Sequence, residues 1–152
     1  MSKSVKNGEV LLAIDGGGTH TRCAAYTLDG QQLAVGYGGP SNHLAVSNSQ
    51  ALDSIQTAIA NTLHFCNLKP DDIQFVSAGF AGVDYDGAGA PDMETLLAEA
   101  GYPKALIFGD MVTAHAGALN GQPGILVLAG TGAVYFGTSS NGSSLKLGGF
   151  GY

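Results

Sequence analysis

Asp15 and the glycines that follow it form the first segment whose residue types suit chemistry on phosphates. The segment DGGGTHT begins where the apolar run 10–15 ends. Backbone N–H groups of a glycine-rich turn, together with a threonine hydroxyl, can surround phosphate oxygens. A carboxylate beside them can hold Mg²⁺ directly or through water, since this ion prefers one or two carboxylates plus phosphate. The candidate metal ligand is Asp15, and the candidate phosphate ligands are Gly16, Gly17, Gly18 and Thr19.

On these residues alone, a plain glycine-rich hairpin with Asp15 as a turn residue is an equally good interpretation. Two better-known phosphate-binding patterns do not fit. No Gly-Lys-Ser/Thr follows the glycines, which excludes the P-loop pattern. Residues 21–28 have the pattern of a strand rather than a helix, which excludes the dinucleotide-binding fingerprint.

A second turn of similar composition occurs late in the chain. Gly130, Thr131 and Gly132 follow the apolar run 125–129, again in a strand-turn-strand pattern. Taken alone, this motif favours a tight hairpin with no further role. Two such turns facing each other across a cleft could hold the phosphates of a nucleotide.

Asp110 is the third candidate, at the end of a predicted strand and the start of a predicted helix. An aspartate in that place can cap the helix, and by itself this is the better interpretation. It can also act as a general base that takes a proton from an attacking hydroxyl, as phosphoryl transfer requires. The two roles can coexist.

The elements that must position these residues follow from short apolar runs punctuated by glycine and proline. Their order is βββαβαβα and then a strand and a hairpin, which predicts an α/β fold with a mixed sheet and helices on both faces. We expect strands at 10–15, 21–28, 33–37, 73–78, 105–108, 125–129, 133–138 and 144–147, and helices at 49–66, 91–100 and 113–119.

The composition bounds the function. Of the 152 residues, 45% are hydrophobic and 12% are charged, so the chain can bury a core. A net charge of −6 with six basic residues argues against nucleic-acid and anionic-membrane partners. No apolar run reaches the length of a membrane span, and residues 1–9 lack the apolar stretch of a signal peptide, so we expect a cytoplasmic protein. Cys23 and Cys66 have no metal-type spacing and are interpreted as buried thiols.

Five motifs in order give a resemblance to a known family. DGGGTHT, GPSN, GDMVTAHAGAL, LVLAGTG and GGFG, spread from about Val10 to the last residue, resemble segments of the N-acetylglucosamine and glucosamine kinases. These are BadF/BadG/BcrA/BcrD-type ATPases, within the superfamily of actin, hexokinase and the heat-shock ATPases. The resemblance implies a ribonuclease H-like (actin-like ATPase) domain with a five-stranded sheet over residues 1–121. It implies the first hairpin of a second, similar domain over residues 122–152.

The resemblance also implies roles for individual residues, with ATP and Mg²⁺ as cofactors. Asp110 would accept the proton of the 6-hydroxyl of an amino sugar, and the turns at 16–19 and 130–132 would be the two phosphate loops. Phe150 stands where the family has tryptophan, which keeps an apolar wall but removes the indole N–H donor and leaves the exact sugar open. The implied sugar contacts are Asn42, Gly82, Asp110, Thr131, Gly149 and Phe150.

Two alternatives stay open. The chain could belong to an ATPase that activates or senses a partner protein; such reductase activators carry an iron–sulfur cluster, whose cysteine pattern Cys23 and Cys66 do not resemble. The chain could also be an inactive N-terminal portion, because the family continues with an acidic segment and a second, adenosine-binding domain. We expect a truncated chain, since it stops at Tyr152 in an aromatic and glycine-rich run. A homodimer is compatible with the resemblance.

Overall fold

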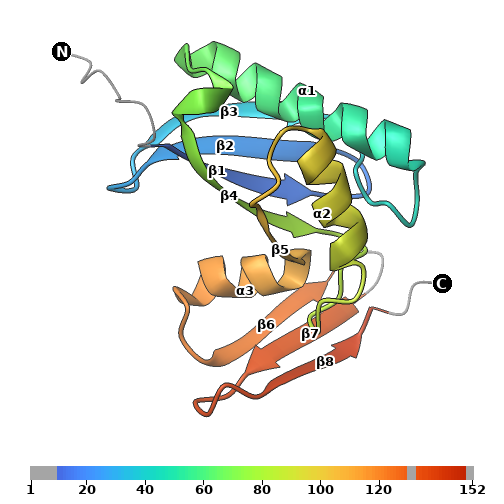
Figure 1. Cartoon of the computed structure of the whole chain (residues 1–152). Coiled ribbons are helices and arrows are strands. Elements are labelled where there is room, and N and C mark those ends of the chain that lie inside the picture. Colours follow the sequence, from blue (N-terminus) through green and yellow to red (C-terminus); the bar gives the residue numbers. More distant parts are fainter. Residues whose placement is uncertain (1–9, 130–132, 150–152) are drawn as a thin grey trace.

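The computed structural model describes residues 10–129 and 133–149, so the predicted site residues Gly130, Thr131, Gly132 and Phe150 lie outside it. Figure 1 shows two sheets joined by a helix. The elements are β1 (Val10–Gly16), β2 (Thr21–Thr27), β3 (Gln32–Gly38), α1 (Asn48–Cys66), a 3₁₀ turn (Pro70–Asp72), β4 (Ile73–Phe80), α2 (Ala90–Glu99), β5 (Leu106–Gly109), α3 (Asp110–Leu119), β6 (Gly124–Ala129), β7 (Ala133–Thr138) and β8 (Ser144–Gly148).

The first sheet has five strands in the order β3-β2-β1-β4-β5. β1 pairs antiparallel with β2 and parallel with β4, so the sheet is mixed, as the order of elements predicts. In this register Asp15 lies opposite Arg22 of β2 and Gly79 of β4. Successive side chains of a strand point to opposite faces, so these three positions share one face of the sheet.

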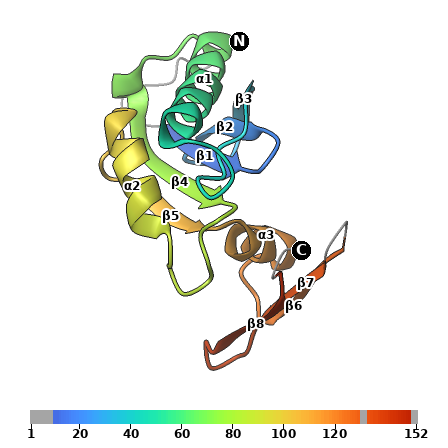
Figure 2. The ribbon, with the colours of Figure 1, turned by 90° about the vertical axis from the view of Figure 1, so that its right-hand side faces the viewer.

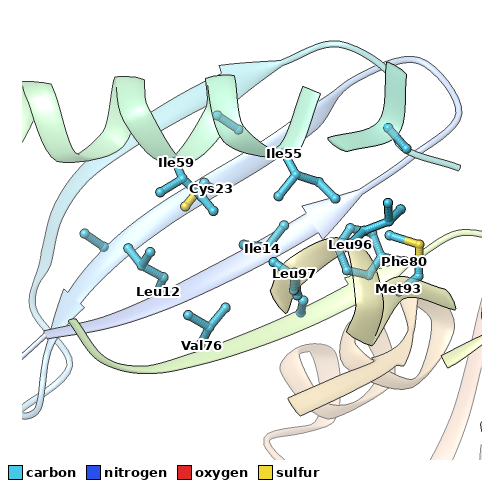
Figure 3. Close-up of a cluster of buried hydrophobic side chains, with 14 of the residues drawn as sticks. Leu12, Ile14, Cys23, Ile55, Ile59, Val76, Phe80, Met93, Leu96 and Leu97 are labelled. Carbon is cyan, nitrogen blue, oxygen red and sulfur yellow. The ribbon is translucent and has the colours of Figure 1, made fainter. Parts of the chain in front are cut away.

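The other face of the five-stranded sheet carries the hydrophobic core (Figure 3). α1 and α2 cover this face, and their apolar sides follow the helical spacing of the sequence. α1 approaches β3 closely because β3 offers glycine where it passes: a Cβ added at Gly38 would lie 2.0 Å from the Ser54 carbonyl oxygen. The labelled core side chains are Leu12, Ile14, Cys23, Ile55, Ile59, Val76, Phe80, Met93, Leu96 and Leu97.

The second sheet is an antiparallel meander, β6-β7-β8, and α3 lies between it and the first sheet (Figure 2). Its inner face packs on α3, where the rings of His115 and Phe136 meet edge to face at 5.3 Å. Its outer face is apolar and open to solvent, since Ile125 is 73% exposed. The side chains sharing that outer face are Ile125, Val127, Tyr135, Leu145 and Leu147.

Most predicted element ends agree with the structure to within one residue, and two are wrong by more. β4 continues through Gly79 and Phe80, which pair with β1 and β5, whereas the sequence suggests that the strand ends at residue 78. α3 begins at Asp110, three residues before the predicted start, and its N-cap is Gly109 rather than Asp110. β5 therefore runs directly into α3, and a Cβ at Gly109 would lie 2.6 Å from the Val83 carbonyl oxygen, so this junction has room only for glycine.

Candidate active site

The predicted phosphate-binding turn lies between β1 and β2 and is hydrogen-bonded to two other predicted site segments. The Gly17 N–H donates to the His20 carbonyl oxygen at 3.0 Å, which closes the turn. The Gly17 carbonyl oxygen accepts from the N–H groups of Ser41 (3.0 Å) and Asn42 (3.2 Å). The Ala81 N–H donates to the Gly16 carbonyl oxygen at 2.8 Å. The turn, the GPSN segment and the end of β4 thus form one hydrogen-bonded unit.

The glycines of this turn differ in whether packing requires them. A Cβ at Gly16 would lie 2.2 Å from the Phe80 ring and 2.5 Å from the Ser41 hydroxyl, so packing alone requires a glycine there. A Cβ at Gly18 would meet no atom within 4 Å. Gly18, Thr19 and His20 are all exposed, so this part of the turn is open to a ligand.

Asn42 and Gly82, two predicted sugar contacts from distant parts of the chain, lie side by side. A Cβ at Gly82 would come within 2.7 Å of the Asn42 Oδ1, and the φ of +96° at Gly82 also favours glycine. Asn42 Oδ1 accepts the Leu44 N–H at 3.0 Å, so part of its side chain already shapes its own loop. The adjacent His43 side chain is only 6% exposed.

Asp15 and Asp110 line one groove of about 480 Å³ on the sheet face opposite the core. β1 supplies Asp15, and the start of α3 supplies Asp110. Two carboxylates in one open groove suit a metal-bound polyphosphate and a proton acceptor. The groove is lined by Ala13, Ile14, Asp15, Arg22, Ala24, Tyr26, Ser77, Asp110, Thr113, Ala114 and Gly117.

The local environment raises the pKa of Asp110 above its ordinary value. Burial is the main cause, and the charge of Asp15 adds to it, while the Met111 N–H and the charge of Lys146 act in the opposite direction. The Met111 N–H donates to Asp110 Oδ1 at 2.7 Å, and the Thr113 hydroxyl donates to the Asp110 carbonyl oxygen at 2.9 Å. A carboxylate whose pKa lies closer to neutral is a better general base than a fully solvated one.

Arg22 is a groove residue that the sequence reasoning missed. It lies directly opposite Asp15 in the β1–β2 register and lines the same groove. A guanidinium there brings a fixed positive charge to a site proposed for phosphates. The signal that could have found it is the alternation of β2, which places residues 22, 24 and 26 on the face of Asp15.

The structure does not place the other predicted site residues in the groove of Asp15 and Asp110. Asn42, Gly82 and Gly149 are not among the residues lining the Asp15–Asp110 groove. Gly149 follows β8 with a φ of +75°, and its N–H donates to the Ala133 carbonyl oxygen at 3.1 Å. The second predicted phosphate turn lies outside the described residues, so its distance from the first turn stays a prediction.

Both cysteines are free thiols; Cys23 is buried as expected, whereas Cys66 is only partly buried, so the expectation of a buried thiol is wrong there. Burial raises the pKa of Cys23 to about 11, and the Thr62 hydrogen bond offsets only part of this. The thiolate is the form that binds metals, so Cys23 is a poor ligand.

Within residues 10–129 and 133–149, no three His, Cys, Asp or Glu side chains gather as a metal site. In the same residues, no helix combines the length and the apolar character needed to cross a membrane.

The strand order β3-β2-β1-β4-β5, with α1 and α2 on one face and α3 on the other, defines the ribonuclease H-like fold of actin-type ATPases. The chain belongs to the BadF/BadG/BcrA/BcrD ATPase family, whose model matches residues 12–151. Both findings confirm the resemblance that the five motifs indicate.

Named relatives are similar along nearly the whole chain. N-acetylmuramic acid/N-acetylglucosamine kinase of Clostridium acetobutylicum is 29% identical over 143 residues, which cover 93% of this chain and 46% of that protein. N-acetyl-D-glucosamine kinase of Dictyostelium discoideum is 27% identical, with 94% and 48% covered. A solved structure from Chromobacterium violaceum, assigned as an N-acetylglucosamine kinase, superposes with a TM-score of 0.77 at 27% identity, covering 95% of this chain and 50% of that one. The chain thus spans about half the length of these relatives.

Proposed function

We propose that this chain is the N-terminal part of a kinase that transfers the γ-phosphoryl group of ATP to the 6-hydroxyl of N-acetylglucosamine or glucosamine. The observation that carries the proposal is the groove shared by Asp15 and Asp110, next to a hydrogen-bonded unit of turn 17–20 and Asn42. The similarity to N-acetylglucosamine kinases supports the choice of sugar.

In this proposal Asp110 takes the proton of the sugar hydroxyl as its oxygen attacks the γ-phosphorus. The bond from the γ-phosphorus to the bridging oxygen breaks, and ADP leaves with the electron pair of that bond. Asp15 would hold Mg²⁺, which would supply positive charge to offset the negative charge of the phosphates. The rest of catalysis is alignment of the two substrates, because phosphoryl transfer needs little covalent help from the protein.

The proposal assigns the exposed residues Gly18 and Thr19 to the phosphates, with Arg22 as an additional cation in the groove. Asn42 and Gly82 would contact the sugar, together with Thr131, Gly149 and Phe150. The β6-β7-β8 sheet would be the beginning of a second ATPase domain that starts near residue 122. We further propose a cytoplasmic location and weak ATP binding by the 152-residue chain when it stands alone.

A thermal-shift screen combined with a phosphoryl-transfer assay tests the proposal. The protein at its natural length is mixed with N-acetylglucosamine, glucosamine or glucose, with and without ATP–Mg²⁺. Ligands that bind only the folded state raise its midpoint temperature. We expect one amino sugar to raise the midpoint and to accept phosphate, with Asp110→Asn abolishing transfer while the sugar-induced shift survives. Near wild-type turnover in Asp110→Asn would contradict the assignment of the base.

A further inference from the structure

Lys146 links two parts of the molecule that the sequence keeps 62 residues apart. From β8, its Nζ donates to both carboxylate oxygens of Asp84, each at 3.0 Å. Asp84 lies in the loop between β4 and α2, so the ion pair bridges the second sheet and the loop that leaves the first sheet. The Lys146 side chain is 18% exposed and that of Asp84 is 39% exposed.

The loop held by Lys146 is compact and borders two predicted site residues. The Asp84 N–H donates to the Ala88 carbonyl oxygen at 2.8 Å, which closes the loop on itself. Just before Asp84, Gly82 lies against Asn42, and the carbonyl oxygen of the buried Val83 lies against the glycine preceding Asp110. A displacement of this loop would therefore move the predicted sugar contact and the start of α3 together.

The same ammonium group also acts on Asp110. The charged groups around Asp110 are Asp15 on β1, Arg22 on β2 and Lys146 on β8, while His115 on α3 itself turns to the Gly124 carbonyl oxygen at 3.0 Å. Burial and the charge of Asp15 raise the pKa of Asp110, and the charge of Lys146 lowers it. For Asp84, burial acts to raise the pKa, but its bonds with Lys146 and the Tyr85 N–H lower it overall.

The ion pair contributes too little to the stability of the folded chain for stability alone to explain it. Partly exposed pairs contribute only about 0–1 kcal/mol to the folded state. The ring contact of Tyr85 with Phe136, with centroids 6.1 Å apart, already joins the loop to the second sheet. What the ion pair adds is a direct link between β8 and the loop at 83–89.

We infer that Lys146 is a positioning residue for the proposed phosphoryl transfer: its ion pair holds the loop at 83–89 against β8 and, through the contact of Val83 with Gly109, fixes the start of α3 at Asp110. This inference rests on the proposed function, because it gives Lys146 a role in that reaction. Lys146 itself touches Asp84 rather than the reacting atoms, so it acts through the loop and through Asp110.

The test compares Lys146→Met, Lys146→Arg and Asp84→Asn in the protein at its natural length, with Lys104→Met as the matched control. Lys104 is exposed in the loop before β5, at the far end of that strand from Asp110. We expect Lys146→Met to lose about ten- to a hundred-fold in kcat/KM for the sugar, on the scale expected for a misplaced catalytic group. Lys146→Arg should recover most of this loss, because arginine keeps the charge and can pair with both oxygens of Asp84.

The pH profile reports on the charge of Lys146, and the sugar KM reports on the position of the loop. Removing the positive charge raises the pKa of Asp110, so the acid limb of kcat/KM should move to higher pH in Lys146→Met. Asp84→Asn releases the loop and the ammonium from each other, so it should raise the sugar KM while shifting the acid limb less than Lys146→Met does, because the lysine charge is retained. Thermal unfolding of each variant confirms that the comparison is made on folded protein.

Three results would overturn the inference. Lys146→Met within two-fold of wild type in both kcat and KM would show that the ion pair does not position anything. A Lys104→Met variant that loses as much activity would show a general effect of net charge. Wild-type protein that phosphorylates none of the sugars would refute the proposed function itself, and the role of Lys146 would fall with it; the first two results leave the kinase assignment intact.

Discussion

Gly79→Ala tests whether the packing of α3 on β4 sets the position of Asp110. A Cβ at Gly79 would lie 2.2 Å from the Thr113 Oγ1, 2.9 Å from its Cγ2 and 3.1 Å from its Cβ. Ordinary contact begins at 3.4 Å, so the helix or the side chain must withdraw by about 1.2 Å. Rotation of Thr113 would break its hydrogen bond to the Asp110 carbonyl oxygen.

We expect Gly79→Ala to destabilise the folded chain by about 1–3 kcal/mol, the usual cost of overpacking. For a chain of this length that corresponds to a fall in midpoint temperature of roughly 3–10 °C. In an active kinase we expect kcat to fall about a hundred-fold, since a displacement near 1 Å is enough for a loss of that size.

Urea unfolding and steady-state kinetics measure the two effects. Gly117→Ala is the matched control for the unfolding measurement, because it adds the same methyl group to α3 where no atom lies within 4 Å; since Gly117 lines the groove, it is not a control for the kinetics. It should stabilise the chain by about 0.5–1 kcal/mol, since alanine replaces glycine inside a helix. The double variant Gly79→Ala/Thr113→Ala should regain most of the stability, because both closest contacts are gone. A Gly79→Ala protein as stable and active as wild type would refute the reasoning.

Three further predictions rest on burial and packing elsewhere in the chain. Because burial raises the pKa of Asp110, its ionised form is disfavoured in the folded chain at pH 7. Asp110→Asn should therefore raise the midpoint temperature of unfolding at pH 7, and this gain should disappear below the ordinary carboxyl pKa. Differential scanning calorimetry at a series of pH values measures both effects. Cys66 should react with a thiol reagent before Cys23, because Cys23 is buried with a pKa of about 11; mass spectrometry of labelled peptides reads the order. Gly38→Ala should cost at least about 3 kcal/mol in urea unfolding, because its Cβ would meet the rigid backbone of α1 at Ser54.

Most of the fold was predictable because its signals are local. Apolar runs of strand length, the helical spacing in α1 and the turn glycines give the order of elements, and Gly30 and Gly142 have the positive φ expected of hairpin turns. The start of α3 was missed because β5 passes into the helix with no loop residues between them. An aspartate after a strand then has the pattern of a cap, although Gly109 holds that position.

The site was predictable in its residue types but not in its geometry. Nothing local distinguishes Gly16, which packing against Phe80 requires, from Gly18, which is open to solvent. That Asp15 and Asp110 share a groove depends on the parallel register of β1 with β4 and on the crossing of α3, which are long-range properties. The pairing of Lys146 with Asp84 likewise has no local signature.

The position of Asp110 as the first residue of α3 has a mechanical consequence. α3 contacts β4 and β5 on one side and β6 and β7 on the other, so any rotation of one sheet relative to the other would have to take place about this helix. A residue on a hinge axis hardly moves when the hinge turns, whereas contacts far from the axis change most. Such a swing would leave the aspartate in register with the first sheet, and the strain would fall on the Lys146–Asp84 bridge and on the Tyr85–Phe136 contact.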